Sequence, residues 1–462
     1  MAALPLFLNV LAEQRAALKR PVDALPPPLS VPNPTKSFWI DSPGANPLAK
    51  EGSDGQLTAD ADIAIIGSGI TGVSAAYHLS RLFADTGSID KPIKIVILEA
   101  RDFCANGGHL TANFFSEFAA YSALFGVEDA KRAIALEQRT VAKSQSSILV
   151  AGGRTHLLFT EHEIAEVQVD YEAARAAGLD VGDVEFLTKE QVEKEYGARY
   201  PGVRTPGYNI WPLKLVTHLH KLTEETGKNS ATSSLHLHTN TPVTAISSIA
   251  FGCSSLPSYV LHATNAYASH LLPQLRGPSG IIPTRGQIIA TRAAVSDSAL
   301  TNSAFIGKEG FEFWFPRPLE PGRTQPLVIL GGGRESTKPE FELYEADDST
   351  VNLKVGETLR KFLPAVFPGR YEGGNEPEVE WSGIMGYTKT GDPFVGPVID
   401  PANPDAYKGQ YISADFAGHG MPRTFSCAEA VAQMILADLQ GKEWIIPEWL
   451  PHYHRTQNRP NE

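Results

Sequence analysis

A short apolar segment that runs into a glycine-rich turn and then a helix constrains this chain more than any other feature. Ala61–Gly67 (ADIAIIG) has the length and uninterrupted apolar character of a buried parallel strand, and Gly69–Leu82 follows with helical spacing of its apolar residues. Lys94–Glu99 (KIVILE) is a second strand of the same kind. Strand, helix and strand in this order predict a βαβ unit with a parallel sheet.

The turn itself indicates a ligand. Gly67 to Gly72 (GSGITG) fit the pattern G-x-G-x-x-G between a strand and a helix, as a dinucleotide site requires. Gly67 makes the tight turn, Gly69 lets the backbone approach a pyrophosphate, and Gly72 lets the helix pack close to the strand. Glu99 ends the next strand and can accept hydrogen bonds from the hydroxyls of an unphosphorylated ribose. The alternative is a glycine turn in an unrelated α/β domain, and this unit alone does not separate NAD from FAD.

Composition excludes several classes of function. The 462 residues include 40 Lys and Arg against 52 Asp and Glu, and the net charge of −12 disfavours nucleic acid and anionic membrane surfaces as partners. Three cysteines without a CxxC pattern predict no disulfide framework and no zinc site. No apolar run approaches the ~20 residues that span a bilayer. The N-terminus lacks the basic region of a secretory signal, so we expect a short amphipathic helix there, with a transit peptide as the alternative, and a cytoplasmic protein.

The later elements predict a second domain. We expect helices at 128–149, 164–177, 190–196, 213–223, 351–362 and 424–439, and strands at 235–239, 243–247, 259–263, 286–291, 311–315 and 327–330. This order predicts an α/β Rossmann-like domain interleaved with an α+β substrate domain on a mixed or antiparallel sheet. The Pro-rich residues before 61 predict an extended arm, within which Ser37-Phe38-Trp39 should dock on the core or line a pocket.

Four further motifs give the chain a specific resemblance. They are Asn106–His109 (NGGH), Trp381–Thr388 (WSGIMGYT), Gly391–Pro397 (GDPFVGP) and Gly418–Met421 (GHGM). With the glycine turn, and in this order, they resemble the D-amino-acid-oxidase-like family of FAD-dependent oxidoreductases, which includes glycine, sarcosine and γ-glutamylputrescine oxidases. The resemblance covers nearly all of the chain after residue 37. It implies an FAD-binding domain at 61–125, 212–282 and 380–445, a substrate domain at 126–211 and 283–379, an arm at 1–60 and a tail at 446–462.

The resemblance also implies a cofactor site. Its residues would be Gly67, Ser68, Gly69, Ile70, Thr71, Gly72, Glu99, Ala100, Arg101, Asn106, Gly107, Gly108, Val243, Thr264, Asn265, Asp392, Gly418, His419, Gly420 and Met421. Some members attach FAD through a cysteine near the Gly-Tyr-Thr segment. Met385 stands at that position here, and a thioether cannot form the bond, so we expect non-covalent FAD.

The implied reaction is oxidation of the CH–NH bond of a small amine or amino acid. A hydride passes from the uncharged amine to the flavin, an imine forms, and oxygen or another acceptor reoxidises the cofactor. Substrate-side candidates are His109, Arg285, Trp314 and Tyr387. His109 is about as well explained as a core histidine, Arg285 as a surface or backbone-bonding arginine, and one of Phe313 and Trp314 as a core residue. No catalytic base and no metal ligand is assigned.

Two departures from the family keep other functions open. Related sequences carry several more residues just before Asn106, where Cys104-Ala105 leads directly into it here, and the segment Ser247–Tyr259 is also short. The shortening either weakens FAD binding, reroutes the chain, or reflects an imperfect gene sequence. The alternatives are therefore a flavin-fold protein that acts as a non-catalytic binding protein, or a flavoenzyme that tailors a secondary metabolite.

Overall fold

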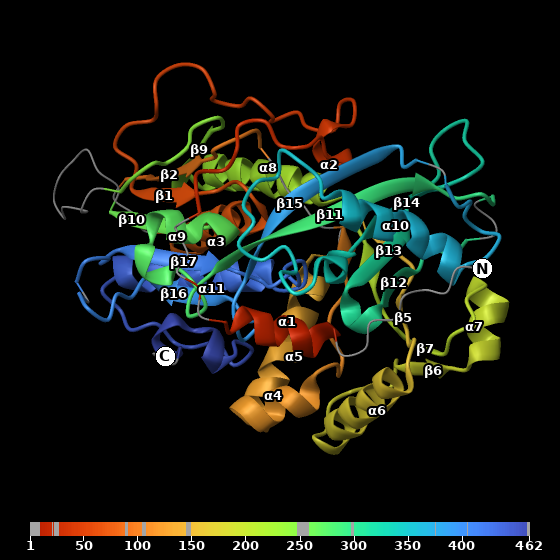
Figure 1. Ribbon diagram of the computed structural model, residues 1–462. Helices are drawn as coiled ribbons and strands as arrows, with labels where there is room; N and C mark the ends of the chain where they lie inside the picture. The colour runs from red at the N-terminus through yellow and green to blue at the C-terminus, as the bar shows by residue number, and fades with distance from the viewer. Residues whose placement is uncertain are drawn as a thin grey trace.

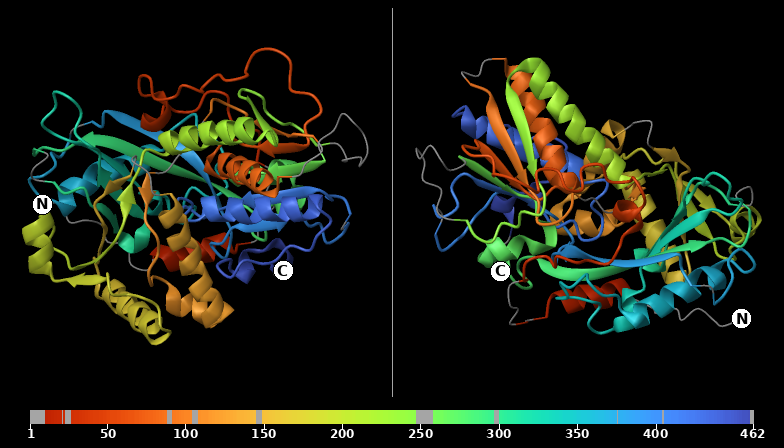
Figure 2. Two further views of the ribbon diagram at one scale, coloured as in Figure 1. Left: turned by 180° about the vertical axis from the view of Figure 1, so that it is seen from behind. Right: turned by 90° about the horizontal axis from the view of Figure 1, so that it is seen from above.

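The computed structural model describes residues 10–20, 22, 27–87, 91–103, 108–144, 149–246, 258–296, 300–374, 376–403 and 405–459 (Figure 1). Two large sheets form separate halves of the molecule, which is clearest in the view from above (Figure 2). One half therefore corresponds to the predicted nucleotide unit, and the other supplies the face opposite to it.

The first sheet has six strands and contains the predicted βαβ unit. Its order is β16 (Phe394–Pro397), β17 (Gln410–Ala414), β10 (Tyr259–His262), β1 (Ile63–Ile66), β2 (Ile93–Leu98) and β9 (Ser233–His238). All neighbours are parallel except β16 and β17. Every residue of β1 is buried, because parallel strands flank it and helices cover the sheet.

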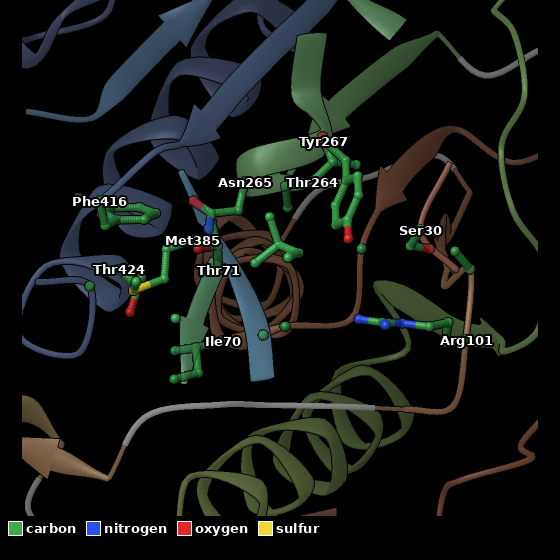
Figure 3. A pocket seen from close by; sticks show the side chains of 18 of the residues that line it. Ser30, Ile70, Thr71, Arg101, Thr264, Asn265, Tyr267, Met385, Phe416 and Thr424 are labelled. Atoms are coloured by element: carbon green, nitrogen blue, oxygen red, sulfur yellow. The ribbon is translucent and has the colours of Figure 1, made fainter. Parts of the chain in front are cut away.

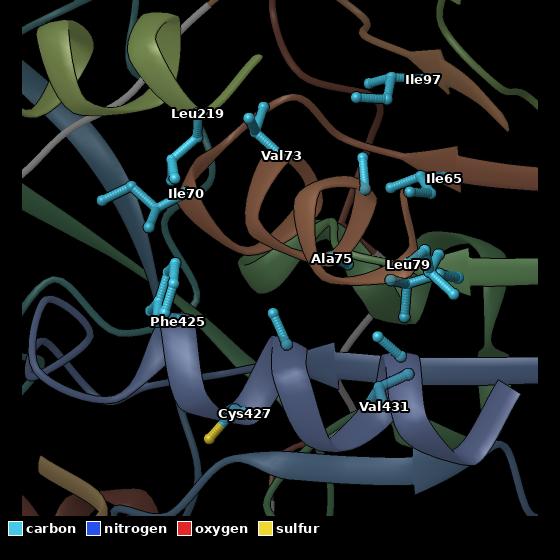
Figure 4. Packing of buried hydrophobic residues seen from close by; sticks show 14 of the residues in the cluster. Ile65, Ile70, Val73, Ala75, Leu79, Ile97, Leu219, Phe425, Cys427 and Val431 are labelled. Atoms are coloured by element: carbon cyan, nitrogen blue, oxygen red, sulfur yellow. The ribbon is translucent and has the colours of Figure 1, made fainter. Parts of the chain in front are cut away.

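Three helices bury one face of this sheet. They are α3 (Ile70–Thr86), α8 (Pro212–Ser230) and α11 (Thr424–Leu439). Figure 4 shows Ile70 and Leu79 of α3 on the side of Phe425 and Val431 of α11, and Val73 on the side away from α11. The helix α3 ends at Gly87, whose φ of +66° suits the left-handed C-terminal cap that glycine favours.

The second sheet has eight strands and is mostly antiparallel. Its order is β15 (Val379–Tyr387), β11 (Ile282–Arg292), β14 (Leu327–Gly331), β13 (Glu312–Pro316), β12 (Ala304–Gly307), β5 (Arg154–Leu157), β7 (Gly202–Thr205) and β6 (Glu185–Leu187). One face packs on α10 (Leu353–Val366) through Trp314, Leu330 and Phe362. We call the opposite face the inner face. The division drawn from the sequence had placed residues from 380 onward with the nucleotide unit, whereas β15 pairs with β11 in this sheet.

Smaller elements connect the two halves. A three-stranded sheet has the order β3 (His109–Leu110), β8 (Tyr208–Asn209) and β4 (Val150–Ala151). The remaining α-helices are α1 (Val10–Leu18), α2 (Phe38–Asp41), α4 (Phe118–Phe125), α5 (Val127–Lys143), α6 (Glu161–Ala176), α7 (Lys189–Tyr196) and α9 (Ala268–Leu271). Short 3-10 helices are η1 (Asn265–Tyr267), η2 (Pro273–Leu275), η4 (Lys308–Gly310), η5 (Arg334–Thr337), η6 (His452–His454) and η7 (Thr456–Asn458). None of the helices in the described ranges has the length and apolar character needed to cross a membrane.

Three expectations about secondary structure were wrong. Residues 243–246 of the predicted strand at Val243–Ser247 form no strand, and Ser247 lies outside the described residues. The helix predicted to end before Pro364 runs to Val366, since a proline in the last turn removes only one helical hydrogen bond. We also expected no helix or strand at 227–234, a polar segment between the predicted helix at 213–223 and the predicted strand at 235–239. It is mostly the end of α8 and the start of β9, because packing on the core overrides weak local propensity there.

The N-terminal arm lies along both halves of the molecule. Thr35 exchanges hydrogen bonds with Ser382 of β15, with Thr35 Oγ1 2.9 Å from the Ser382 N–H. Further along the arm, Trp211 Nε1 donates to the Trp39 carbonyl at 3.0 Å, and Asn46 donates to the Phe103 carbonyl at 2.7 Å. These contacts tie an extended, proline-rich segment to the folded domains.

Candidate cofactor and substrate site

A cavity of about 410 Å³ lies between the start of α3 and the inner face of the eight-stranded sheet. Figure 3 shows Ser30 and Arg101 at one end, Thr264 and Tyr267 along the side, and Met385 and Phe416 at the other end. The volume falls within the range of small-molecule sites. Most of the predicted cofactor residues meet here: Gly67, Gly69, Ile70, Thr71, Glu99, Ala100, Arg101, Val243, Thr264, Asn265, Gly418, Gly420 and Met421.

Two of the three glycines in the glycine turn are required by the protein's own geometry. Gly67 has a φ of +107°, and an added Cβ would lie 2.7 Å from the Ala263 carbonyl oxygen. A Cβ on Gly72 would lie 2.0 Å from the Gly67 carbonyl oxygen, which is how helix and strand approach so closely. Gly69 is different, because a Cβ there would have no protein atom within 4 Å. The turn thus leaves open space at Gly69, where the backbone borders the cavity.

The start of α3 can bind an anion. Gly69 is its N-cap residue and supplies no side-chain cap, so the first N–H groups of the helix meet no side-chain acceptor at that cap. These groups and the positive end of the helix dipole form an anion site of the kind that holds phosphates. Ser68 lies in this turn but does not line the cavity, and its backbone N–H and its Oγ both donate to Glu99 Oε2, at 2.8 and 2.9 Å.

Two charged residues mark the end of the cavity beyond β2. Glu99 is buried, and its Oε1 accepts the Arg101 backbone N–H at 3.0 Å. A carboxylate has lone pairs for about four hydrogen bonds, so Glu99 retains capacity for ligand hydroxyls. Arg101 Nη1 donates to both carboxylate oxygens of Asp348, at 2.9 and 3.1 Å. This pair joins the nucleotide unit to a loop of the other half of the molecule.

Residues after β10 line the side of the same region. Thr264 Oγ1 is buried and has no hydrogen-bond partner within the described part of the chain. Asn265 directs its side-chain oxygen to the Asp415 backbone N–H at 2.9 Å. A buried hydroxyl without a partner on the cavity wall indicates that a ligand or water completes its hydrogen bonding.

The N-terminal arm contributes residues that sequence reasoning left unassigned. Leu29 and Ser30 line the cavity near Arg101, and His270 Nδ1 contacts the Pro27 carbonyl at 2.9 Å. Trp39 lines the cavity further along and stacks on Phe315 with a ring separation of 6.2 Å. Trp39 therefore fulfils both expectations for the aromatic pair, since it is buried in a core cluster and borders the cavity. Leu29 and Ser30 belong to no motif in the sequence, so their place in the cavity could not be predicted from it.

The far end of the cavity faces the start of α11. Gly418 has a φ of +78°, and a Cβ there would lie 2.7 Å from the Tyr387 hydroxyl and 3.7 Å from the Met385 sulfur. Gly420, Met421 and Phe416 complete this end. The glycines permit close backbone approach, and the positive end of α11, which begins at Thr424, favours negative charge there.

The inner face of the eight-stranded sheet forms the apolar floor of the cavity. Its contributors are Gly286, Ile288, Phe313, Phe315, Ile329, Trp381 and Gly383. The only Asp, Glu, Lys or Arg among all described lining residues are Glu99 and Arg101, at the opposite end. The cavity is therefore polar and charged at one end and apolar at the other.

Three of the four substrate-side candidates either face away from the cavity or are bonded to other residues of the protein. Strand alternation turns Arg285 away from the cavity that its neighbour Gly286 lines, and its guanidinium bonds Glu342 at 2.8 Å. Trp314 is 1% exposed and stacks on Phe305 on the α10 side, so its neighbour Phe313 is the one that reaches the cavity. Tyr387 is buried, and its hydroxyl accepts from Arg334 Nη2 at 2.9 Å.

His109 lies beside Phe315 of the cavity floor and does not itself line the cavity. Its ring centre is 6.2 Å from that of Phe315, and burial lowers the pKa of His109 to about 3. The neighbouring Gly108 fits between Phe315 and Trp39, with a virtual Cβ 2.7 Å from the Phe315 ring. Asn106 and Gly107 lie outside the described residues.

Two predicted cofactor residues serve other contacts in this structure. His419 Nε2 lies 3.1 Å from Glu137, whose other oxygen accepts from Arg423 Nε at 2.8 Å. Burial alone would raise the pKa of Glu137, but the charges of His419 and Arg423 bring it below its ordinary value. Asp392 is buried beside Tyr121, whose hydroxyl lies 3.3 Å away, and does not line the cavity.

The cavity fits FAD on grounds of chemistry. It offers free helix N–H groups and open space at Gly69 for a pyrophosphate, Glu99 for ribose hydroxyls, an unpartnered hydroxyl at Thr264, and an apolar end for a flat ring. No group of three or more potential metal ligands occurs among the described residues. The arrangement of these groups is that of a dinucleotide site.

Comparison with solved structures shows the same fold in amino-acid-oxidising enzymes. L-proline dehydrogenase from P. horikoshii has a TM-score of 0.60 and 17% identity, over 86% of this chain and 98% of that chain. Glycine oxidase from Geobacillus kaustophilus has a TM-score of 0.56 and 20% identity, over 84% and 97%. L-amino acid deaminase from Proteus myxofaciens, in complex with anthranilate, has a TM-score of 0.58 and 14% identity, over 93% and 98%. No curated protein matches the chain.

The sequence also matches a protein family. Residues 62–434 match the family described as FAD dependent oxidoreductase, which confirms the resemblance drawn from the glycine turn and the four later motifs. The match spans both sheets and the cavity between them. The chain therefore belongs to the FAD-dependent oxidoreductase family, with FAD as its cofactor.

Proposed function

We propose that this enzyme oxidises the CH–NH bond of a small amine or amino acid and releases the corresponding imine. The observation that carries the proposal is the contrast along the cavity, with its charged groups at the glycine-turn end and an apolar floor of sheet residues at the other. An apolar site favours the uncharged form of an amine, and only that form has the lone pair needed for imine formation. Solved structures of the same fold include a glycine oxidase and a proline dehydrogenase, whose names agree with this class of donor.

The chain's own residues bind and orient the reactants. The start of α3, Glu99 and Thr264 would hold the dinucleotide, and Gly418 and Gly420 would allow backbone approach to the ring. FAD, when bound, supplies the two-electron acceptor. Phe313, Phe315 and Ile329 would exclude water from the donor, and the positive end of α11 would stabilise negative charge that develops at the neighbouring edge of the ring. We assign no general base.

We further propose that FAD is bound without a covalent link. Met385 lines the far end of the cavity, beside the start of α11, which we call the flavin end. Its sulfur lies near Gly286 and Gly418. Acid precipitation of purified protein should release all of the FAD into the supernatant. Yellow colour that stays with the precipitate would contradict this proposal.

The decisive test of the reaction uses the purified holoprotein. Its visible spectrum should show bound flavin, and anaerobic addition of donors from a panel of amines and D- and L-amino acids should bleach it. Failure of every CH–NH donor to bleach a protein that holds FAD would overturn the proposal and favour a flavoenzyme with another donor. Oxygen consumption with the donor so identified would then distinguish an oxidase from a dehydrogenase.

A further inference from the structure

The N-terminal arm adds walls to the cavity from outside the region that matches the family. The match covers residues 62–434, and every described residue that lines the cavity lies inside it except Leu29, Ser30 and Trp39. Leu29 and Ser30 lie near Arg101, at the end of the cavity farthest from Met385 (Figure 3). The arm is therefore a feature of this chain that contributes to a site otherwise built from the family's own region.

Hydrogen bonds fix the arm on both sides of this end of the cavity. His270 of α9 donates from Nδ1 to the Pro27 carbonyl at 2.9 Å. Further along, the Thr35 backbone N–H donates to the Asp348 carbonyl at 2.7 Å, and Thr35 Oγ1 accepts the Ser382 N–H at 2.9 Å. The helix α9 follows β10 of the six-stranded sheet, whereas Ser382 belongs to β15 of the eight-stranded sheet. Residues 27–35, which we call the clasp, thus join the two halves of the molecule.

The clasp is held at its ends and is not hydrogen-bonded between them. Within the described chain, no hydrogen bond joins residues 28–34 to another residue. Pro28 and residues 32–34 are exposed, whereas residues 29–31 are half-buried. Proline fixes φ at Pro28, Pro32 and Pro34, so the clasp is stiff and loses little conformational entropy when it closes. Release of the bonds at one end would let the clasp move away from the cavity.

The chemistry under the clasp suits the adenosine half of FAD. Phosphates fit the start of α3, and an acidic residue that ends the second strand of such a unit bonds ribose hydroxyls, which is the position of Glu99. A base attached to that ribose would lie beyond Glu99. The lining there includes Leu29, Val243, Leu271 and Tyr267. Apolar side chains and an aromatic ring favour a flat aromatic group, as the adenine base is.

Ser30 supplies a polar group to the same place. It lines the cavity and is half-buried, and its hydroxyl makes no hydrogen bond within the described chain. A serine hydroxyl can both donate and accept, so it can bond a ring nitrogen, an amino group or a ribose hydroxyl. The clasp thus presents one apolar and one hydrogen-bonding side chain to a ligand at this end.

We propose that Leu29 and Ser30 bind the adenosine half of FAD and that the clasp closes over it, so that the cofactor enters and leaves only when one end of the clasp is released. Leu29 packs on the base, and Ser30 bonds the base or the ribose. A barrier that must open for both entry and exit slows both rates, so the clasp lengthens the residence of FAD more than it lowers the Kd. The proposal concerns the cofactor and does not depend on which donor the enzyme oxidises.

The test locks the clasp with a removable disulfide. Thr35 Oγ1 and Ser382 Oγ lie 3.3 Å apart, so cysteines at both positions can form a disulfide after a small shift. The double variant Thr35→Cys, Ser382→Cys is loaded with FAD while reduced and is then oxidised. After dilution, the FAD that passes an ultrafiltration membrane is measured over time. Release should be at least tenfold slower in the oxidised than in the reduced form, and reductant should restore the fast rate. Loading of the oxidised full chain with FAD should be slowed likewise.

The double variant Thr155→Cys, Ser303→Cys is the matched control. The two hydroxyls lie 3.4 Å apart, both residues are buried, and neither lines the cavity. This disulfide should leave the rate of FAD release unchanged. Equal slowing by both disulfides would mean that overall stability sets the rate of release. That result, or release from the locked clasp as fast as from the reduced form, would overturn the proposal.

Single substitutions test the adenosine contacts without a disulfide. Leu29→Ala and Ser30→Ala should each speed FAD release from the holoprotein at least fivefold. Val31→Ala is the control, since Val31 belongs to the clasp but does not line the cavity, and it should leave the rate unchanged. ADP carries the adenosine without the flavin, so it should compete with FAD during loading, with an inhibition constant at least fivefold weaker in Leu29→Ala and Ser30→Ala than in Val31→Ala. Failure of ADP to compete, or equal inhibition constants in the three variants, would show that the clasp does not contact the adenosine.

Discussion

The two ends of the cavity are built on different principles. At the glycine-turn end, six consecutive residues and a strand end supply backbone N–H groups, one carboxylate and one arginine. At the flavin end, apolar side chains come from four strands of the other sheet, from the arm and from the loop before α11. The first end depends on local backbone geometry, and the second depends on how distant segments pack.

This difference separates the binding of FAD from the binding of the donor. A backbone-built site that binds phosphate is tolerant of side-chain identity but intolerant of an added Cβ. A site built from packed side chains can change its occupant when one of them changes. We therefore expect substitutions at the glycine turn to alter retention of FAD, and substitutions on the sheet and arm to alter the donor site with smaller effects on FAD.

The largest effect should come from the glycine turn, where two neighbouring glycines can be compared. Gly72→Ala places a Cβ 2.0 Å from a backbone oxygen, so the turn must shift. We expect a lower melting temperature and at least 100-fold weaker FAD binding in a fluorescence titration. Gly69→Ala has room in the protein, so it should keep the melting temperature of the apoprotein yet weaken FAD at least tenfold. Unchanged FAD affinity in Gly69→Ala would show that the cofactor does not approach this backbone.

The next largest effect should come from the arm. Trp39→Ala removes a side chain that is 3% exposed and stacked on Phe315, and such truncations cost about 3–5 kcal/mol. Because Trp39 also borders the flavin end, the visible spectrum of the bound flavin should shift. Phe38→Ala is the control, since Phe38 packs on Trp39 without lining the cavity and should affect stability less. A spectrum unchanged in Trp39→Ala would separate the arm from the cofactor.

The sequence predicted the first end of the cavity well because its signals are local. A strand, a turn with fixed glycine positions and a helix specify one another within about 40 residues, and Gly67 and Gly72 show the predicted backbone constraints, while Gly69 borders open space. The sequence also predicted the type of both sheets, one parallel and the other mixed or antiparallel. The strand at 243–247 was not found, since a short β-branched segment carries no information on whether a partner strand lies beside it.

The flavin end was predicted poorly. Its lining depends on which face of the sheet each strand residue occupies and on contacts between segments far apart in the sequence. Arg285 and Trp314 each miss the cavity by one residue, and neighbours on a strand face opposite sides of the sheet. At the first end too, distant contacts matter, since Leu29 and Ser30 reach the cavity near Arg101 because the arm is fastened at Thr35 and at Pro27. Arg154 and His156 precede Phe313 and Phe315 by more than 150 residues, and only the sheet order brings their strands into one sheet.

A smaller effect on FAD binding should distinguish a buried ion pair from an exposed one, both near the glycine-turn end of the cavity. Asp348 is buried and pairs with Arg101, whereas Asp102 pairs with Lys50 near the surface. Asp348→Asn should weaken FAD binding about five- to tenfold, because Arg101 loses the charge that fixes its position. Asp102→Asn should change it less than twofold, since exposed pairs contribute little. Equal effects of the two substitutions on the FAD titration would mean that the Arg101 pair does not organise this end.

The smallest expected effect is on the pH dependence of stability, and it concerns Asp415, which lies between Asn265 and Phe416. Asp415 is fully buried, and burial raises its pKa to about 8. The folded protein then holds a proton on Asp415 that the unfolded chain releases above pH 4, so this residue lowers stability progressively as the pH rises from about 4 to about 8. Asp415→Asn keeps an acceptor for the Ala417 N–H and cannot ionise. Its melting temperature should therefore match that of the natural protein near pH 5 and exceed it by a few degrees at pH 8.5. Asp405→Asn, at an exposed acid, should follow the natural protein at every pH. A difference between Asp415→Asn and the natural protein that stays constant from pH 5 to 8.5 would mean that Asp415 does not carry this proton.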